Sequence, residues 1–196
     1  NRFLQFWTAQ TERMRIDSVG RLLVGSDSSR ANGYGDNAYL QLEGTSYPKA
    51  AISLILNSGN ANGPSLNFAK TRGSNGGSNI VQSGDNLGVI NFAGGDGTDI
   101  KSAGARIRAQ VDGTAGGNDM PTRIVFETTP DGSVSPNERM RIDSSGNFNL
   151  VSSSSTLTDL NFTNSSLDVY ARVEGGKSGS GVGDLRFHTY SGGLSE

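Results

Sequence analysis

The sequence contains no cysteine, one histidine and one tryptophan among its 196 residues. Without cysteine it can form neither a disulfide framework nor a cysteine-ligated zinc site. Its 17 basic and 19 acidic residues give a net charge of −2 and form no block of one sign, so no nucleic-acid-binding patch is indicated. No apolar run approaches the roughly 18 residues of a membrane span, so we expect no membrane insertion.

Large apolar side chains are also scarce. Hydrophobic residues make up 33% of the chain and aromatic residues 7%, whereas glycine alone occurs 28 times. Glycine, serine and asparagine favour turns and loops, so a mainly helical protein is not expected. A compact monomer of this length buries about 70% of the surface of its unfolded chain. This composition therefore favours an elongated shape, or a core that is shared between chains.

A nine-residue segment occurs twice. Residues 12–20 read Glu-Arg-Met-Arg-Ile-Asp-Ser-Val-Gly, and residues 138–146 differ from them only in Ser145, which replaces Val19. A Phe-x-Thr tripeptide lies upstream of each copy, at 6–8 and 126–128, and recurs at 187–189. Chance does not explain this agreement, so we interpret the chain as an array of repeated units.

Weaker similarities extend the repeat. Residues 90–93 resemble 160–163, and we align 109–113 with 171–175. The predicted parts are 1–25, the end of a preceding repeat with its hairpin; 26–86, an inserted β block; 87–150, a β repeat module with its hairpin; and 151–196, a shorter module truncated before its hairpin.

The ends of the sequence support this interpretation. The chain begins at Asn1 inside an apolar, strand-like run, without an initiator methionine or a signal peptide. At the other end, Glu196 stands where a third copy of the nine-residue segment would begin. We therefore expect the chain to be a piece of a longer protein.

Apolar and polar residues alternate along most segments, which is the pattern of β-strands. In 123–128, Ile124 and Phe126 share the predicted apolar face and Glu127 the predicted solvent-facing one, although Val125 makes this strand ambiguous. Short strands separated by glycine-rich turns predict an all-β fold of repeated short-strand modules joined by hairpins. The apolar run at 50–56 is interpreted as a buried strand.

The repeated segment carries its own turn signal. Asp17 suits the first position of a type I turn, and Gly20 can take the left-handed conformation that follows. The Asp17 carboxylate is expected to cap the amides of the turn. We predict the same structural role for Asp143, with Gly146 as its glycine, and a catalytic role for neither aspartate.

Residues 87–94, 121–126 and 138–147 resemble tail-fibre proteins of tailed bacteriophages, particularly marine ones. Their sequences are Leu-Gly-Val-Ile-Asn-Phe-Ala-Gly, Pro-Thr-Arg-Ile-Val-Phe and Glu-Arg-Met-Arg-Ile-Asp-Ser-Ser-Gly-Asn. The resemblance covers most of the chain and is weakest over 26–60. It implies an elongated homotrimeric fibre in the virion, outside the cell. We predict that this chain is a structural segment of such a fibre, which positions the host-binding tip and has no catalytic activity.

The resemblance also implies partners. These are two identical chains and the adjoining tail or virion proteins, and a contact with a host glycan or protein is left open. In such a trimer, Met140 and Ile142 are expected to pack across the three-fold axis, as are Met14 and Ile16. The arginines on the opposite strand face, Arg13, Arg15, Arg139 and Arg141, are expected to pair with Glu12, Asp17, Glu138 and Asp143.

No pattern predicts a catalytic centre, a metal site or a cofactor. Residues 94–100 match the calcium-binding nonapeptide of repeats-in-toxin proteins, but that motif works in tandem and occurs here once, so a plain turn is expected. His188 lies where the other repeats hold Trp7 and Glu127, which argues against catalysis. No spacing places an acid pair on one strand face among Asp96, Asp99, Asp112, Asp119 and Glu127.

The receptor-binding residues are unknown from the sequence. Tyr34, Tyr39 and Tyr47 lie in the insertion and are the best candidates for stacking on a glycan. Two other classes stay open, namely a polysaccharide-degrading tailspike enzyme, which would need two suitably spaced carboxylates, and a bacterial β-rich adhesin. A tailspike should show a long uninterrupted run of short coils, whereas this chain shows long units ending in one hairpin.

Overall fold

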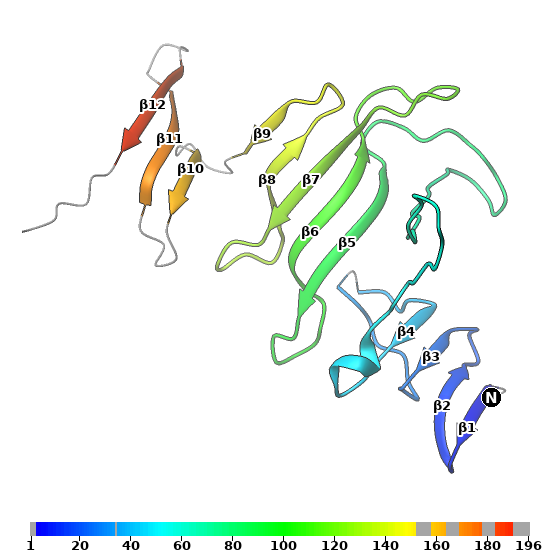
Figure 1. Ribbon diagram of the computed structural model, residues 1–196. Helices are drawn as coiled ribbons and strands as arrows, with labels where there is room; N and C mark the ends of the chain where they lie inside the picture. The colour runs from blue at the N-terminus through cyan, green and yellow to red at the C-terminus, as the bar shows by residue number, and fades with distance from the viewer. Residues whose placement is uncertain (1–2, 34, 152–157, 164–168, 178–182, 190–196) are drawn as a thin grey trace, which may run out of the picture.

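The computed structural model describes residues 3–33, 35–151, 158–163, 169–177 and 183–189, with backbone alone in the last three ranges. Within them the chain forms twelve strands in three sheets, and its one helical element is a 3₁₀ turn, η1 (Tyr47–Ala50). Figure 1 shows that each sheet is built from strands that are consecutive in the chain. The all-β prediction is confirmed. No helix in the described part of the chain has the length and apolar character to span a membrane.

The first sheet contains four short strands in chain order. The first three pair antiparallel, and the fourth runs parallel to the third. They are β1 (Leu4–Thr8), β2 (Thr11–Ile16), β3 (Leu22–Val24) and β4 (Leu40–Leu42). Leu23, in the centre of β3, is the most buried side chain of this sheet, with 1% of its surface exposed.

The second sheet contains five antiparallel strands, again in chain order. A small core lies at one end of it, where Val81, Val111 and Ala115 pack with Leu87. Among the described residues, the large side chains that are fully buried are Leu23, Val111 and Val125. The strands are β5 (Asn86–Gly94), β6 (Ser102–Val111), β7 (Thr122–Thr128), β8 (Asn137–Ile142) and β9 (Phe148–Leu150).

The two copies of the nine-residue segment pair with their neighbours in the same register. Met14 lies opposite Phe6 and Val24, just as Met140 lies opposite Phe126 and Leu150. A β-bulge follows the phenylalanine in both cases. The similar sequences thus form similar three-stranded units, while the four-part division of the chain stays a prediction.

The third sheet contains β10 (Thr158–Thr163), β11 (Val169–Lys177) and β12 (Gly183–Thr189). Its pairing repeats that of β5, β6 and β7. Val173 lies opposite Leu160 and Phe187, as Ile107 lies opposite Ile90 and Phe126. Residues 105–107 therefore correspond to 171–173, and the predicted match of 109–113 to 171–175 is wrong by four residues. The strand partners set this correspondence, and they are remote in sequence.

The insertion contains much less regular structure than predicted. Residues 51–57 form no helix or strand, and Ile52 and Ile55 keep 72% and 77% of their surfaces exposed. The prediction of a buried strand at 50–56 is therefore wrong for this chain. The reason is that no neighbouring strand of the described chain offers its backbone groups to this segment.

Candidate assembly surface

The turn of each repeated hairpin is organised by its aspartate. Asp143 Oδ1 accepts hydrogen bonds from the backbone amides of Ser145 at 3.0 Å and Asn147 at 2.9 Å. Gly146 has a φ of +82°, and its amide donates to the Asp143 carbonyl at 3.0 Å. The hairpin at 17–21 has the same bonds, with Asp17 Oδ1 accepting from the amides at 19 and 21. The predicted capping role of both aspartates is confirmed.

These bonds favour the ionised form of each carboxyl. The backbone amide of Arg21, followed by the Arg21 side chain, holds the pKa of Asp17 below its ordinary value. Donation from the Asn147 side chain and amide does the same to the pKa of Asp143. Hydrogen bonds to a charged form stabilise that form. Both turns are therefore built for pH values at which the aspartates are ionised.

The repeated arginines fulfil their prediction in part. Arg15 pairs with Glu12, and Arg141 pairs with Glu138, as expected. The other two instead donate from Nε to threonine hydroxyls of the preceding strand: Arg13 to Thr8 at 2.8 Å and Arg139 to Thr128 at 3.0 Å. Asp17 and Asp143 bond to groups of their own turns instead of to these arginines. The reason is their position, since each aspartate directly follows the end of a strand, where the chain reverses.

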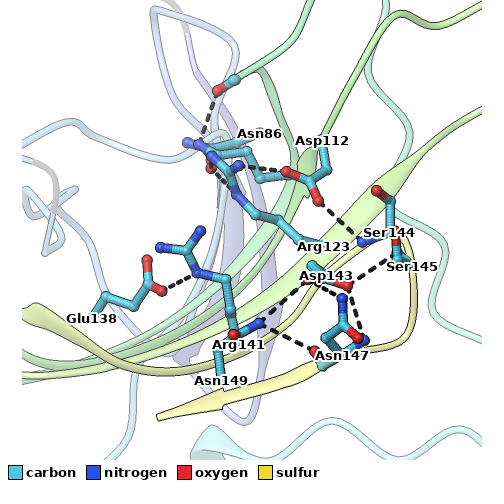
Figure 2. A network of polar contacts seen from close by, with 12 residues as sticks. Asn86, Asp112, Arg123, Glu138, Arg141, Asp143, Ser144, Ser145, Asn147 and Asn149 are labelled. Carbon is cyan, nitrogen blue, oxygen red and sulfur yellow. Dashed lines mark hydrogen bonds and ion pairs between the residues drawn. The ribbon is translucent and has the colours of Figure 1, made fainter. Parts of the chain in front are cut away.

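A polar network covers one face of the second sheet (Figure 2). Arg123 Nε donates to Gln110 at 2.8 Å, and Arg123 Nη1 lies 2.6 Å from Asp112 Oδ1. The other Asp112 oxygen accepts from the amide of Ser144 at 3.0 Å, which ties the hairpin turn to the end of β6. The pKa of Asp112 is lowered, chiefly by this amide.

This polar face is the better buried one, contrary to the expectation that it would face solvent. Val125 is fully buried, and Glu127 keeps 7% of its surface exposed. The register places Arg108 and Arg141 on either side of Val125, and their aliphatic stems can cover it. Arg108 Nη2 lies 2.8 Å from Glu127 Oε1, while the second Glu127 oxygen has no hydrogen-bond partner among the described residues.

The opposite face of the same sheet is apolar and open. The register aligns one row through Ile90, Ile107, Phe126 and Met140, and a second row through Ile124, Ile142 and Phe148. Six large side chains of this face keep between 36% and 59% of their surfaces exposed. We call this face the assembly surface, and its six exposed side chains are Ile90, Phe92, Ile124, Ile142, Phe148 and Leu150.

Part of the insertion already lies against one edge of the assembly surface. Residues 66–68 line a hollow of about 360 Å³ together with residues 87–90 of β5 and Ile124. Phe68 approaches Gly88 so closely that a Cβ built on this glycine would lie 2.6 Å from the Phe68 Cβ. Phe148 and Leu150 were missed as members of this surface by the sequence analysis, although their alternation around Asn149 is the signal of a strand with one apolar face.

The other sequence-predicted residues do not form one site. Asp96 Oδ1 accepts from the amides of Thr98 and Asp99, and its Oδ2 accepts from the Ser102 hydroxyl, which lowers the Asp96 pKa to about 2. Asp99 lies 2.7 Å from Lys101 Nζ. The calcium-like segment thus forms a turn whose carboxylates are engaged by its own donors.

The tryptophan and two of the tyrosines in the first 50 residues are exposed rather than buried. Trp7, Tyr39 and Tyr47 keep 56%, 68% and 89% of their surfaces exposed. Tyr47 lines a shallow hollow in which no other aromatic ring takes part. Tyr34 lies outside the described residues, and so does the side chain of His188. The structure therefore brings no pair of these rings into a common pocket in the part that it describes.

The fold resembles that of phage tail-fibre domains. No family model matches the chain, and no curated protein matches it. The carboxy-terminal domain of the bacteriophage T5 L-shaped tail fibre matches 80% of this chain with a TM-score of 0.58 and 20% identity. A second structure, of that domain with its intramolecular chaperone domain, matches 97% of this chain with a TM-score of 0.63 and 19% identity. The chain spans 63% and 51% of these two proteins. The predicted similarity to phage tail fibres is thus confirmed for the fold.

Proposed function

We propose that this chain is a structural segment of a phage tail fibre, which assembles as a homotrimer in the virion and positions a host-binding tip. The observation that carries the proposal is the open assembly surface on a sheet of tail-fibre fold. Contiguous exposed apolar patches are rare on soluble monomers and mark contacts with other molecules. A fibre of identical chains provides such a contact along its whole length.

The small core of the single chain supports assembly. Among the described residues, the fully buried large side chains are Leu23, Val111 and Val125, whereas six large apolar side chains of the assembly surface stay exposed. A core that is shared between chains does not need a complete core in each chain.

The proposal assigns the chain no catalytic activity. Asp112 and Glu127, two acids considered above for a glycosidase pair, are held by Arg123 and Arg108. Asp85 of the insertion pairs with Arg72. The guanidinium of Arg72 is the main cause that lowers the pKa of Asp85. A glycosidase acid needs a raised pKa to remain protonated, whereas the pKa values of Asp112 and Asp85 are lowered, so their environments favour structural roles.

Sedimentation equilibrium of the full chain tests the proposal. We expect a species of three times 20.5 kDa, with β-rich circular dichroism and cooperative melting. A well-folded monomer across the micromolar range would refute the assembly. Incubation with host capsule or lipopolysaccharide tests the second part, since newly formed reducing ends that vanish on replacing one carboxylate would identify a tailspike enzyme instead.

A further inference from the structure

We infer that residues 51–57 bind to a neighbouring copy of this chain, and that they cover that copy's assembly surface with the side chains of Ile52, Leu54 and Leu56. The inference rests on the proposed homotrimer and adds a specific contact to it. It starts from the contrast between the apolar composition of this segment and its exposure to solvent. Its residues are among the most apolar of the chain, yet every one of them is exposed.

The segment has the pattern of a strand with one apolar face. Ile52, Leu54 and Leu56 alternate with Ser53, Ile55 and Asn57, so an extended chain would present the first three on one side. Leu54 and Leu56 keep 52% and 47% of their surfaces exposed. No hydrogen bond joins residues 51–57 to the rest of the described chain, which leaves side-chain contacts as the means to hold the segment in place.

The assembly surface of a neighbouring copy is a suitable binding site for residues 51–57. It is apolar, it is open, and the same insertion already demonstrates the fit, because Leu66 and Phe68 lie against its β5 edge at Gly88. Residues 66–68 occupy that edge in their own chain, while Ile142 and Phe148 at the far side remain uncovered. No helix or strand lies between η1 and β5 in this part of the described chain, so regular structure does not fix residues 51–57 to their own chain (Figure 1).

A second copy is the occupant that the composition favours. The segment itself carries no charge, so it offers nothing to a charged partner. Each chain provides one apolar segment and one apolar surface, and exchange around a closed ring of identical chains would cover both without an added partner.

Photo-cross-linking of the full chain tests the contact. The photoreactive residue p-benzoylphenylalanine is placed at position 54, and at position 53 as the matched control on the other side of the segment. We expect covalent dimers on denaturing gels from position 54, at least fivefold more than from position 53, with cross-links to residues 122–150 of the other chain. Monomeric products alone, or dimers linked elsewhere, would overturn the inference.

Footprinting of the unmodified protein with hydroxyl radicals keeps the test independent of the photoreactive side chain. We expect Leu54 and Leu56 to react at least fivefold more slowly in the assembled protein than Val134, which is 93% exposed in the chain. Reaction of Leu54 as fast as Val134 in a protein that sediments as a trimer would refute the contact and leave the proposed function intact. A folded monomer would refute both.

Discussion

Ile142→Ala and Arg141→Ala compare neighbouring side chains of β8 on opposite faces of the second sheet. Full burial of an isoleucine side chain is worth about 1.5–3 kcal/mol. Ile142 keeps 43% of its surface exposed in the chain, so covering the rest on assembly contributes about 1 kcal/mol per chain. In the proposed trimer, three chains give about 3 kcal/mol. Since about 1.4 kcal/mol is tenfold, we expect Ile142→Ala to raise the trimer dissociation constant about 100-fold.

The arginine variant is the control. Arg141 pairs with Glu138 across a partly exposed surface, and such ion pairs contribute about 0–1 kcal/mol. We expect Arg141→Ala to lower the free energy of unfolding by that amount plus the packing of its stem beside Val125, and to leave the dissociation constant unchanged. Sedimentation equilibrium at several concentrations measures the constant for both variants. An equal effect of both, or an effect of Arg141→Ala alone, would show that the assembly surface is not the interface.

Four further predictions concern the hairpin turn and the insertion. Asp143→Ala removes an acceptor of two turn amides and should lower the urea midpoint of unfolding. The pKa of Asp143 is lowered in the folded chain, so the ionised carboxylate stabilises the fold fully above its ordinary pKa. This stabilisation is lost as the pH falls through the pKa of the folded chain. Melting temperatures should therefore be level from about pH 7 to 5 and fall below about pH 4. Gly146→Ala should cost about 1 kcal/mol in urea unfolding, because of its positive φ, whereas Gly117→Ala should be neutral. Gly88→Val should lower the melting temperature and detach Phe68 from β5, seen as faster proteolysis of the insertion.

Each of these has a result that contradicts it. An unchanged urea midpoint for Asp143→Ala would mean that the turn amides are equally well satisfied by water. If Asp143→Asn melts with the same acid dependence as the original chain, other carboxylates cause the loss. Equal effects at Gly146 and Gly117 would contradict the argument from φ, and a Gly88→Val protein with an intact insertion would show that residues 66–68 need no close approach there.

Local chemistry determined much of this protein from its sequence. The hairpin turn depends on residues within five positions of one another, and its aspartate, glycine and flanking strands lie where the sequence predicts them. The alternation of apolar and polar residues likewise predicted the strands that build the sheets. These features need no information from remote parts of the chain, since hydrogen bonds of a turn and the period of a strand are set locally.

Tertiary structure decided which strands of one repeat unit match those of another, and which face of the second sheet is buried. Residues 105–107, rather than 109–111, match 171–173, because the partners across the ladder choose the register. Alternation defines two faces of β7 but does not say which one is covered. Here Val125 and Glu127 are buried next to Arg108, while Ile124 stays partly exposed. Residues 51–57 show the same limit. Their composition predicts burial, but burial requires a surface to pack against, and the single folded chain does not bring one to them.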